Sequence, residues 1–117
     1  MKIAITAHGE DCQATVDTRF GRADYFVIYD QEKAAWETIA NTQNLDAAHG
    51  AGIQAGQLLA KTGAGALITG HVGPKAFKVV NAANITIYSL GTESGTVQAA
   101  LEAFLAGKLS PITAPKP

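Results

Sequence analysis

The chain has 117 residues, a net charge of -1 and an apolar fraction of 47%, which is typical of one globular domain with its own core. No run of Lys or Arg gives the basic surface that nucleic-acid binding needs. No apolar stretch approaches the roughly 18 residues of a membrane span, and the N-terminus lacks a signal-peptide pattern. Cys12 is the only cysteine, so no intrachain disulfide can form. We therefore expect a cytoplasmic protein that binds neither nucleic acid nor membrane.

The first half of the chain predicts three strands and one long loop. Lys2–Ala7 is a short apolar run, and Tyr25–Tyr29 is rich in aromatic and β-branched residues. Ala35–Thr42 alternates in polarity, so it predicts a hairpin partner for the second strand. The segment His8–Asp24 shows no sustained periodicity. Loops of this length in a small domain often bind ligands.

The second half predicts helices alternating with strands. A helix is expected over Gly50–Thr62, ended by Gly63 and Gly65. A strand, a helix opened by proline, a strand and a last helix follow, over Ala66–Thr69, Pro74–Ala83, Ile85–Tyr88 and Val97–Leu105. From Ser110 onward three prolines predict a flexible tail over residues 110–117.

This order predicts one α/β domain over residues 1–109. The βαβ crossovers require parallel pairing of the first, fourth and fifth strands. The hairpin extends the other side, with one strand antiparallel. The expected architecture is a five-stranded mixed sheet, ordered 3-2-1-4-5 and flanked by helices.

Ligands of open α/β sheets bind beyond the carboxyl ends of the parallel strands. Three loops follow those ends. They begin at His8, at Gly70 and at Leu90, and we expect them to converge on one edge. The loop over Asn44–Gly52 is a fourth candidate for that edge.

Two glycine-bearing segments open predicted helices at this edge. One contains Gly70, His71, Val72 and Gly73 before Pro74. The other contains His49, Gly50 and Gly52. Glycine permits close approach of a ligand to the backbone, and a helix N-terminus favours an anion. The alternative is that these glycines only form tight turns. Neither segment is a P-loop or a Rossmann fingerprint.

Arg19, Phe20 and Arg22 form the third candidate group. Two arginines flanking an aromatic ring can clamp an anion through charge-assisted hydrogen bonds. Taken alone, this group is better explained by an arginine paired to Asp17 or Asp24, with Phe20 packed on the core.

Metal ligation and catalysis have weaker support. His8, His49 and His71 are the only histidines and all fall at the candidate edge, but they lack the close spacing of a zinc site. We expect no direct metal ligation by the protein. Cys12 and His71 would be the ligands if it occurred. The carboxylates of the first loop pair with no nucleophile and orienting base, so we expect a protein that is not an enzyme.

Three segments resemble motifs of one family. Arg19–Phe26 resembles a Phe-Gly-Arg-Ala-x-x-Phe signature, His49–Ala55 a His-Gly-x-Gly segment, and Ile68–Phe77 a Thr-Gly-x-x-Gly-Pro-x-Ala segment. All three occur in the dinitrogenase iron–molybdenum cofactor biosynthesis family. The resemblance extends from Met1 to about Leu109.

The resemblance implies a ribonuclease-H-like fold and a role in carrying or assembling molybdenum-containing sulfide clusters. For small stand-alone members it implies a molybdenum–copper sulfide cluster held without covalent ligation. A conventional iron–sulfur cluster is not expected, because it generally needs four cysteines. The predicted contacts of the anionic cluster are His8, Cys12, Arg19, Phe20, Arg22, His49, Gly50, Gly52, Gly70, His71, Val72 and Gly73.

Two other functions remain open at this point. One is a metal-free regulatory or interaction module that docks on a partner ATPase or assembly enzyme. The other is a hydrolase, because ribonuclease-H-like folds often host acidic catalytic sites. Such sites need several carboxylates on the strands, whereas the first, fourth and fifth predicted strands contain no Asp or Glu.

Overall fold

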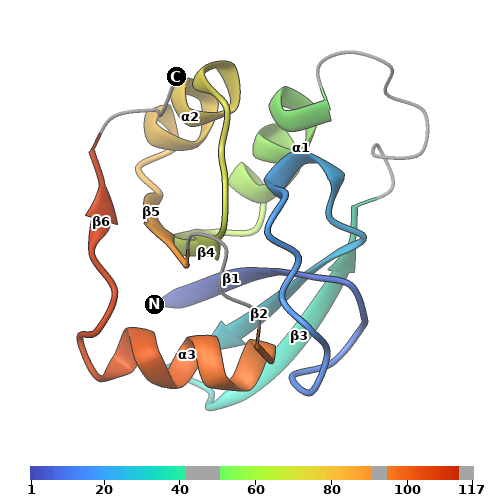
Figure 1. Ribbon diagram of the computed structural model, residues 1–117, viewed down its shortest axis with the longest axis vertical. Coiled ribbons are helices and arrows are strands. Elements are labelled where there is room, and N and C mark those ends of the chain that lie inside the picture. The colour runs from blue at the N-terminus through green and yellow to red at the C-terminus, as the bar shows by residue number, and fades with distance from the viewer. Residues whose placement is uncertain (42–50, 91–94, 114–117) are drawn as a thin grey trace.

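The computed structural model describes residues 1–41, 51–90 and 95–113. These form three layers, with a mixed sheet between helices α1 and α2 on one face and helix α3 on the other (Figure 1). The elements in chain order are β1 (Lys2–Ala7), the 3-10 turn η1 (Phe20–Arg22), β2 (Tyr25–Asp30), β3 (Ala35–Ala40), α1 (Ala51–Ala60), β4 (Ala64–Thr69), α2 (Pro74–Ala82), β5 (Thr86–Ser89), α3 (Val97–Leu105) and β6 (Pro111–Ile112).

Strand β1 lies inside the sheet, as its apolar sequence predicts. Residues 3–7 are buried, because helices cover the sheet on both faces. Ile5 pairs with Val27 of antiparallel β2 and with Ile68 of parallel β4. The parallel pairs β1–β4 and β4–β5 confirm the two predicted crossovers. Their carboxyl ends therefore meet at one edge of the sheet.

The sheet has six strands in the order β3-β2-β1-β4-β5-β6, so the prediction of five strands was wrong. The five predicted strands keep their expected neighbours, and β6 adds to β5. Two strands, β2 and β6, run against the other four, where one antiparallel strand was expected. The ribonuclease-H-like class stays a prediction.

Strand β6 also corrects the predicted tail. Ile112 pairs with Ile87, and Pro111 pairs with Tyr88. Proline is tolerated here because β6 lies at the edge of the sheet, where a missing backbone donor breaks no second ladder. Ile112 packs against the core, which ties the segment down. Residues 114–117 of the predicted tail lie outside the described residues.

Two apolar clusters hold the layers together. Under α1 and α2 the core includes Phe20, Phe26, Leu59, Leu67 and Val80. Under α3 it includes Ile3, Ile5, Ile68, Val97 and Leu101. The strand residues of the two sets alternate along the chain, because successive side chains of a strand point to opposite faces. The 3-10 turn η1 belongs to the first cluster through Phe20, which places the arginine segment on the α1–α2 side.

The helix ends follow local signals with one exception. Gly63 adopts a φ of 81° just beyond α1, the left-handed conformation that favours glycine after a helix. Gly65, predicted as a second terminator, lies inside β4 instead. Thr96 caps α3 by accepting a hydrogen bond from the Ala99 N–H at 3.1 Å. Among the described residues, no helix is long and apolar enough to cross a membrane.

Candidate functional site: a pocket between two helix N-termini

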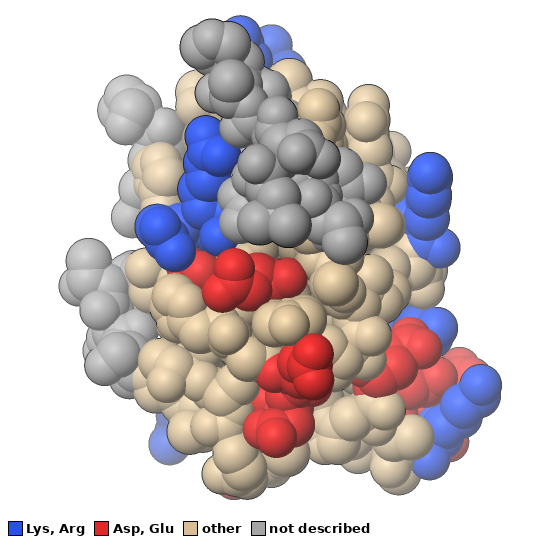
Figure 2. Space-filling model, turned by 90° about the vertical axis from the view of Figure 1, so that its right-hand side faces the viewer, with Lys and Arg blue, Asp and Glu red and all other residues tan. Residues whose placement is uncertain are grey.

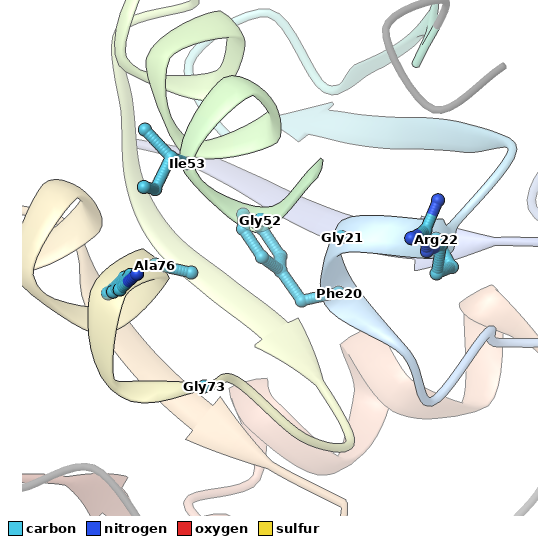
Figure 3. A pocket seen from close by; sticks show the side chains of 8 residues that line it. Phe20, Gly21, Arg22, Gly52, Ile53, Gly73 and Ala76 are labelled. Atoms are coloured by element: carbon cyan, nitrogen blue, oxygen red, sulfur yellow. The ribbon is translucent and has the colours of Figure 1, made fainter. Parts of the chain in front are cut away.

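A pocket of about 320 Å³ lies between η1 and the first turns of α1 and α2 (Figure 3). Three separate stretches of the chain form it, and the Phe20 side chain extends from η1 toward Gly52 at the start of α1. The residues that line it are Phe20, Gly21, Arg22, Gly52, Ile53, Gly73, Lys75 and Ala76.

A seam of small residues brings the two helix starts together. A Cβ placed on Gly52 would lie 2.9 Å from the Cβ of Ala76, and one on Gly56 would lie 2.9 Å from Cγ1 of Val79. Gly52 and Gly56 are four residues apart and so share one face of α1. The absence of their side chains lets α1 approach α2 closely. As a result, both N-termini reach the same pocket.

The N-terminus of α2 offers backbone donors to the pocket. Gly73 is its N-cap and has no side chain with which to cap the helix. The first intrahelical bond runs from the Phe77 N–H to the Gly73 carbonyl at 2.9 Å. The preceding N–H groups, those of Lys75 and Ala76, have no carbonyl partner within the helix. Because neither α1 nor α2 has an acidic residue in its first turn, both helix dipoles favour an anion here.

The side chains around the pocket combine positive charge with an apolar wall. Arg22 and Lys75 are its two basic residues, and Phe20, Ile53 and Ala76 supply apolar surface. Phe20 is fixed, because it is buried and its ring lies 5.8 Å from that of Phe26. Figure 2 faces the right-hand side of Figure 1. Among the described residues on that face, basic and acidic side chains form small groups that lie next to one another in places, and no single large basic patch is seen.

Arg19 does not line the pocket but pairs with Asp17. Its Nε and Nη2 atoms lie 3.1 Å and 3.2 Å from the two oxygens of the Asp17 carboxylate. The hydrogen bond to Asp17 and the negative charge of that carboxylate raise the pKa of Arg19. This is the arrangement that the sequence offered as the alternative to an anion clamp. Phe20 likewise packs on the core, although its ring also forms part of the pocket.

The segment before α2 supports the pocket through its backbone. His71 is exposed, and its N–H donates to the Thr18 carbonyl at 2.8 Å, while its own carbonyl accepts from the Phe20 N–H at 3.3 Å. Val72 is buried in the core. Gly70 is buried beside β5, where its carbonyl accepts from the Ser89 hydroxyl at 2.7 Å. None of the side chains in this segment ahead of Gly73 lines the pocket.

His8 and Cys12 lie away from the pocket. His8 Nδ1 is 3.4 Å from the Asp17 carboxylate. Cys12 packs against the core under α3, and its carbonyl accepts from the Gln98 N–H at 2.8 Å. Across the described ranges, no group of three or more His, Cys, Asp or Glu residues is placed to hold a metal ion.

Four of the twelve predicted contacts therefore line the pocket, namely Phe20, Arg22, Gly52 and Gly73. His49 and Gly50 lie outside the described residues. Gly21, Ile53, Lys75 and Ala76 also line the pocket but were not predicted, although each is adjacent to, or a few residues from, a predicted contact. The first turn of a helix that follows a glycine was the signal that could have identified Lys75 and Ala76.

Comparison with known proteins points to one family. The sequence profile described as "Dinitrogenase iron-molybdenum cofactor" matches residues 1–107. An uncharacterized protein of Methanocaldococcus jannaschii is 32% identical over 112 residues, covering 93% of this chain and 89% of that protein.

Two solved structures are similar over nearly the full chain. The apo form of the orange protein from Desulfovibrio gigas has a TM-score of 0.92 and 44% identity, covering 99% of this chain and 96% of that one. A Thermotoga protein assigned provisionally to NifB has a TM-score of 0.85 and 38% identity, covering 99% and 97%.

Proposed function

Because the chain belongs to the dinitrogenase iron–molybdenum cofactor family, we propose that it binds an anionic, molybdenum-containing sulfide cluster in this pocket. The cluster is cargo that the protein carries or helps to assemble, and the protein itself catalyses no reaction. The observation that supports this most directly is the convergence of two helix N-termini, both free of acidic residues, on one pocket. The proposal places this activity in the cytoplasm and in one domain over residues 1–109.

The lining residues fit a soft anion. The backbone N–H groups of Lys75 and Ala76 and the charges of Arg22 and Lys75 face negative charge. The apolar surface of Phe20 and Ile53 excludes water, which strengthens those interactions. A sulfide cluster presents large, weakly hydrated sulfur atoms. Its transfer from water to such an apolar wall therefore costs little hydration free energy.

Retention of the cluster does not need a protein thiolate. Cys12 is the only cysteine in the chain, and it packs on the α3 side of the sheet. A conventional iron–sulfur cluster generally takes four cysteines. A preassembled molybdenum–copper sulfide cluster, whose metals are already saturated by sulfide, is the cargo that we propose. The apo description of the similar orange protein supports a ligand for that protein, and by extension for this chain.

The test is reconstitution of the apo-protein with tetrathiomolybdate and copper. We expect a coloured complex that co-elutes with the protein on size exclusion. Arg22→Gln should weaken its formation, because it removes a charge that lines the pocket. Lys33→Gln is the matched control, since Lys33 lies in the turn between β2 and β3, away from the pocket lining. Absence of a coloured complex with the wild-type chain refutes the proposal. Equal effects of the two substitutions refute the site.

A further inference from the structure

The carboxylate of Asp17 is almost completely buried, at 1% exposure, although it lies outside the pocket. It accepts three hydrogen bonds from Arg19: from the backbone N–H at 2.9 Å, from Nε at 3.1 Å and from Nη2 at 3.2 Å. A buried carboxylate carries a large desolvation penalty unless it is paired and hydrogen-bonded. The Arg19 side chain, which is 63% exposed, supplies that pairing from the surface, and His8 Nδ1 lies 3.4 Å from the same carboxylate.

The backbone of Asp17 is anchored to the centre of the sheet. Its N–H donates to the Thr6 carbonyl at 2.9 Å, and its carbonyl accepts from the Thr6 hydroxyl at 2.6 Å. The Thr6 and Thr69 hydroxyls share a buried hydrogen bond of 2.7 Å. Asp17 is thus tied at once to the carboxyl ends of β1 and, through Thr6, of β4.

The residues that follow Asp17 join the two walls of the pocket. The Thr18 carbonyl and the Phe20 N–H bond to the backbone of His71, two residues before Gly73. Phe20 begins the wall formed by η1, and Gly73 begins the wall formed by α2 (Figure 3). Residues 17–20 therefore connect the two walls through backbone hydrogen bonds.

We propose that Asp17 is a positioning residue for the pocket, acting through Arg19 to hold the η1 wall at its distance from α2. This inference rests on the proposed function, because it concerns the same pocket. It assigns different roles to the two arginines. Arg19 neutralises and orients a buried carboxylate, whereas Arg22 faces the cargo.

The direction in which one substitution changes the affinity for cargo distinguishes this role from a purely electrostatic effect. Asp17→Asn keeps the size of the side chain but removes a negative charge and one half of the fork to Arg19. If charge alone mattered, binding of an anion would become stronger, since Arg19 would also be released. If Asp17 positions the wall, binding becomes weaker. We expect an affinity for the tetrathiomolybdate–copper cargo lower by about tenfold, which corresponds to about 1.4 kcal/mol.

Asp30→Asn is the matched control. Asp30 also accepts backbone N–H groups within its own turn, from Glu32 at 3.0 Å and Lys33 at 3.3 Å. It pairs with Lys2 at the other end of β1, so its loss should leave cargo affinity unchanged. Affinity is measured at a temperature where each apo-variant is fully folded. Unchanged or stronger binding by Asp17→Asn overturns the proposal.

Arg19→Gln covers the case in which Asp17→Asn fails to fold, because the Arg19 side chain lies largely in solvent. It should weaken binding to a similar degree, and the double variant should be no weaker than either single one, as expected for residues that act as a unit. Additive losses would show that Arg19 contacts the cargo directly and would overturn the proposal.

A readout on the apo-protein separates this proposal from the proposed function. Amide NMR shifts of Gly21, Gly73 and Ala76, which lie on both walls, should change in Arg19→Gln and in Asp17→Asn but not in Asp30→Asn. If the wild-type chain forms no coloured complex while these shifts move, the cargo assignment fails and the positioning role holds. If the shifts stay in place, the positioning role fails whatever the cargo.

Discussion

Gly52 and Ala76 meet so closely that the first has no room for a side chain: a Cβ on Gly52 would lie 2.9 Å from the Ala76 Cβ. Because both atoms are attached directly to helix backbones, relief requires α1 and α2 to separate. Gly52→Ala should therefore destabilise the protein by about 1–2 kcal/mol, since overpacking costs roughly 1–3 kcal/mol and helix propensity returns at most about 1. Urea unfolding measures the difference.

A substitution on the other side of the same contact, Ala76→Gly, provides the control. In an Ala76→Gly background the clash is gone, and Gly52→Ala should become neutral or stabilising through helix propensity alone. The four proteins of this double-mutant cycle isolate the Gly52–Ala76 term. An equal loss of stability in both backgrounds would mean that Gly52 is required for some other reason than the approach of α2.

Lys75 occupies the first turn of α2, where the helix dipole disfavours a positive charge. Lys75→Glu should stabilise the apo-protein by about 0.5–1 kcal/mol while weakening binding of an anionic cargo. Lys78→Glu makes the same chemical change on the same helix but outside the pocket lining. It should change apo stability and cargo affinity much less, because the dipole effect is confined to the first turn. Thermal unfolding and cargo titration give the two readouts. Matching behaviour of the two variants would contradict this reading of Lys75.

Gly73 lines the pocket, and a Cβ built on it meets nothing within 4 Å. Its φ of -68° and ψ of 166° suit any residue. Gly73→Val should therefore leave the fold intact and reduce cargo binding by filling part of the pocket. Gly95→Val is the parallel substitution at an exposed glycine with equally open surroundings among the described residues, outside the pocket lining. Size-exclusion analysis with the coloured cargo would show the difference. Normal loading of Gly73→Val would place the cargo elsewhere.

Tyr25 links the first loop to the sheet. A hydrogen bond to Glu10, together with the negative charge of that carboxylate, raises the pKa of Tyr25 above its ordinary value of 10.0. The unfolded chain then loses its phenolic proton first as the pH rises. The contribution of this contact to stability is complete below about pH 10 and is lost as the pH rises through the raised folded value.

Glu10→Gln should lower the pKa of Tyr25 toward its ordinary value. Ultraviolet titration of the phenolate, or NMR of the labelled tyrosine ring, follows this change. Glu32→Gln, in the turn between β2 and β3, is the matched substitution and should not shift it. A Tyr25 titration that is indifferent to Glu10 would remove the basis for the alkaline loss of stability.

The features that sequence predicted correctly depend on local pattern. The apolar run Lys2–Ala7 gave β1 with its bounds, and Pro74 opens α2 where its missing N–H costs nothing. Family membership, predicted from three short motifs, is confirmed by the match over residues 1–107. Gly52 and Gly73 were predicted because a glycine at a helix start is a local signal for close approach, and both line the pocket, although their role in binding stays a prediction.

The features that sequence missed depend on contacts between distant residues. The segment Pro111–Ile112 has no strand pattern, and its pairing exists only because the edge of β5 is available. Cys12 and His8 were predicted at the site from their position after β1. In the structure the first loop folds back, so that Val16 bonds to the Gly95 carbonyl and carries Cys12 toward α3. For Arg19 the sequence left two roles open, a cargo contact and an ion pair with Asp17, and only the fold shows that Asp17 is buried beside it.

The pocket draws its walls from residues 20–22, 52–53 and 73–76, and no single stretch of the chain can reproduce it. Under the proposed function, a growing chain would have no complete cargo site until the start of α2 has left the ribosome and docked on α1. A cargo that recognises only the native state also holds the protein in that state, by mass action. Under the proposed function, an incomplete or misfolded chain would stay empty, and a filled chain would be stabilised by a free energy that rises with the logarithm of the free cargo concentration.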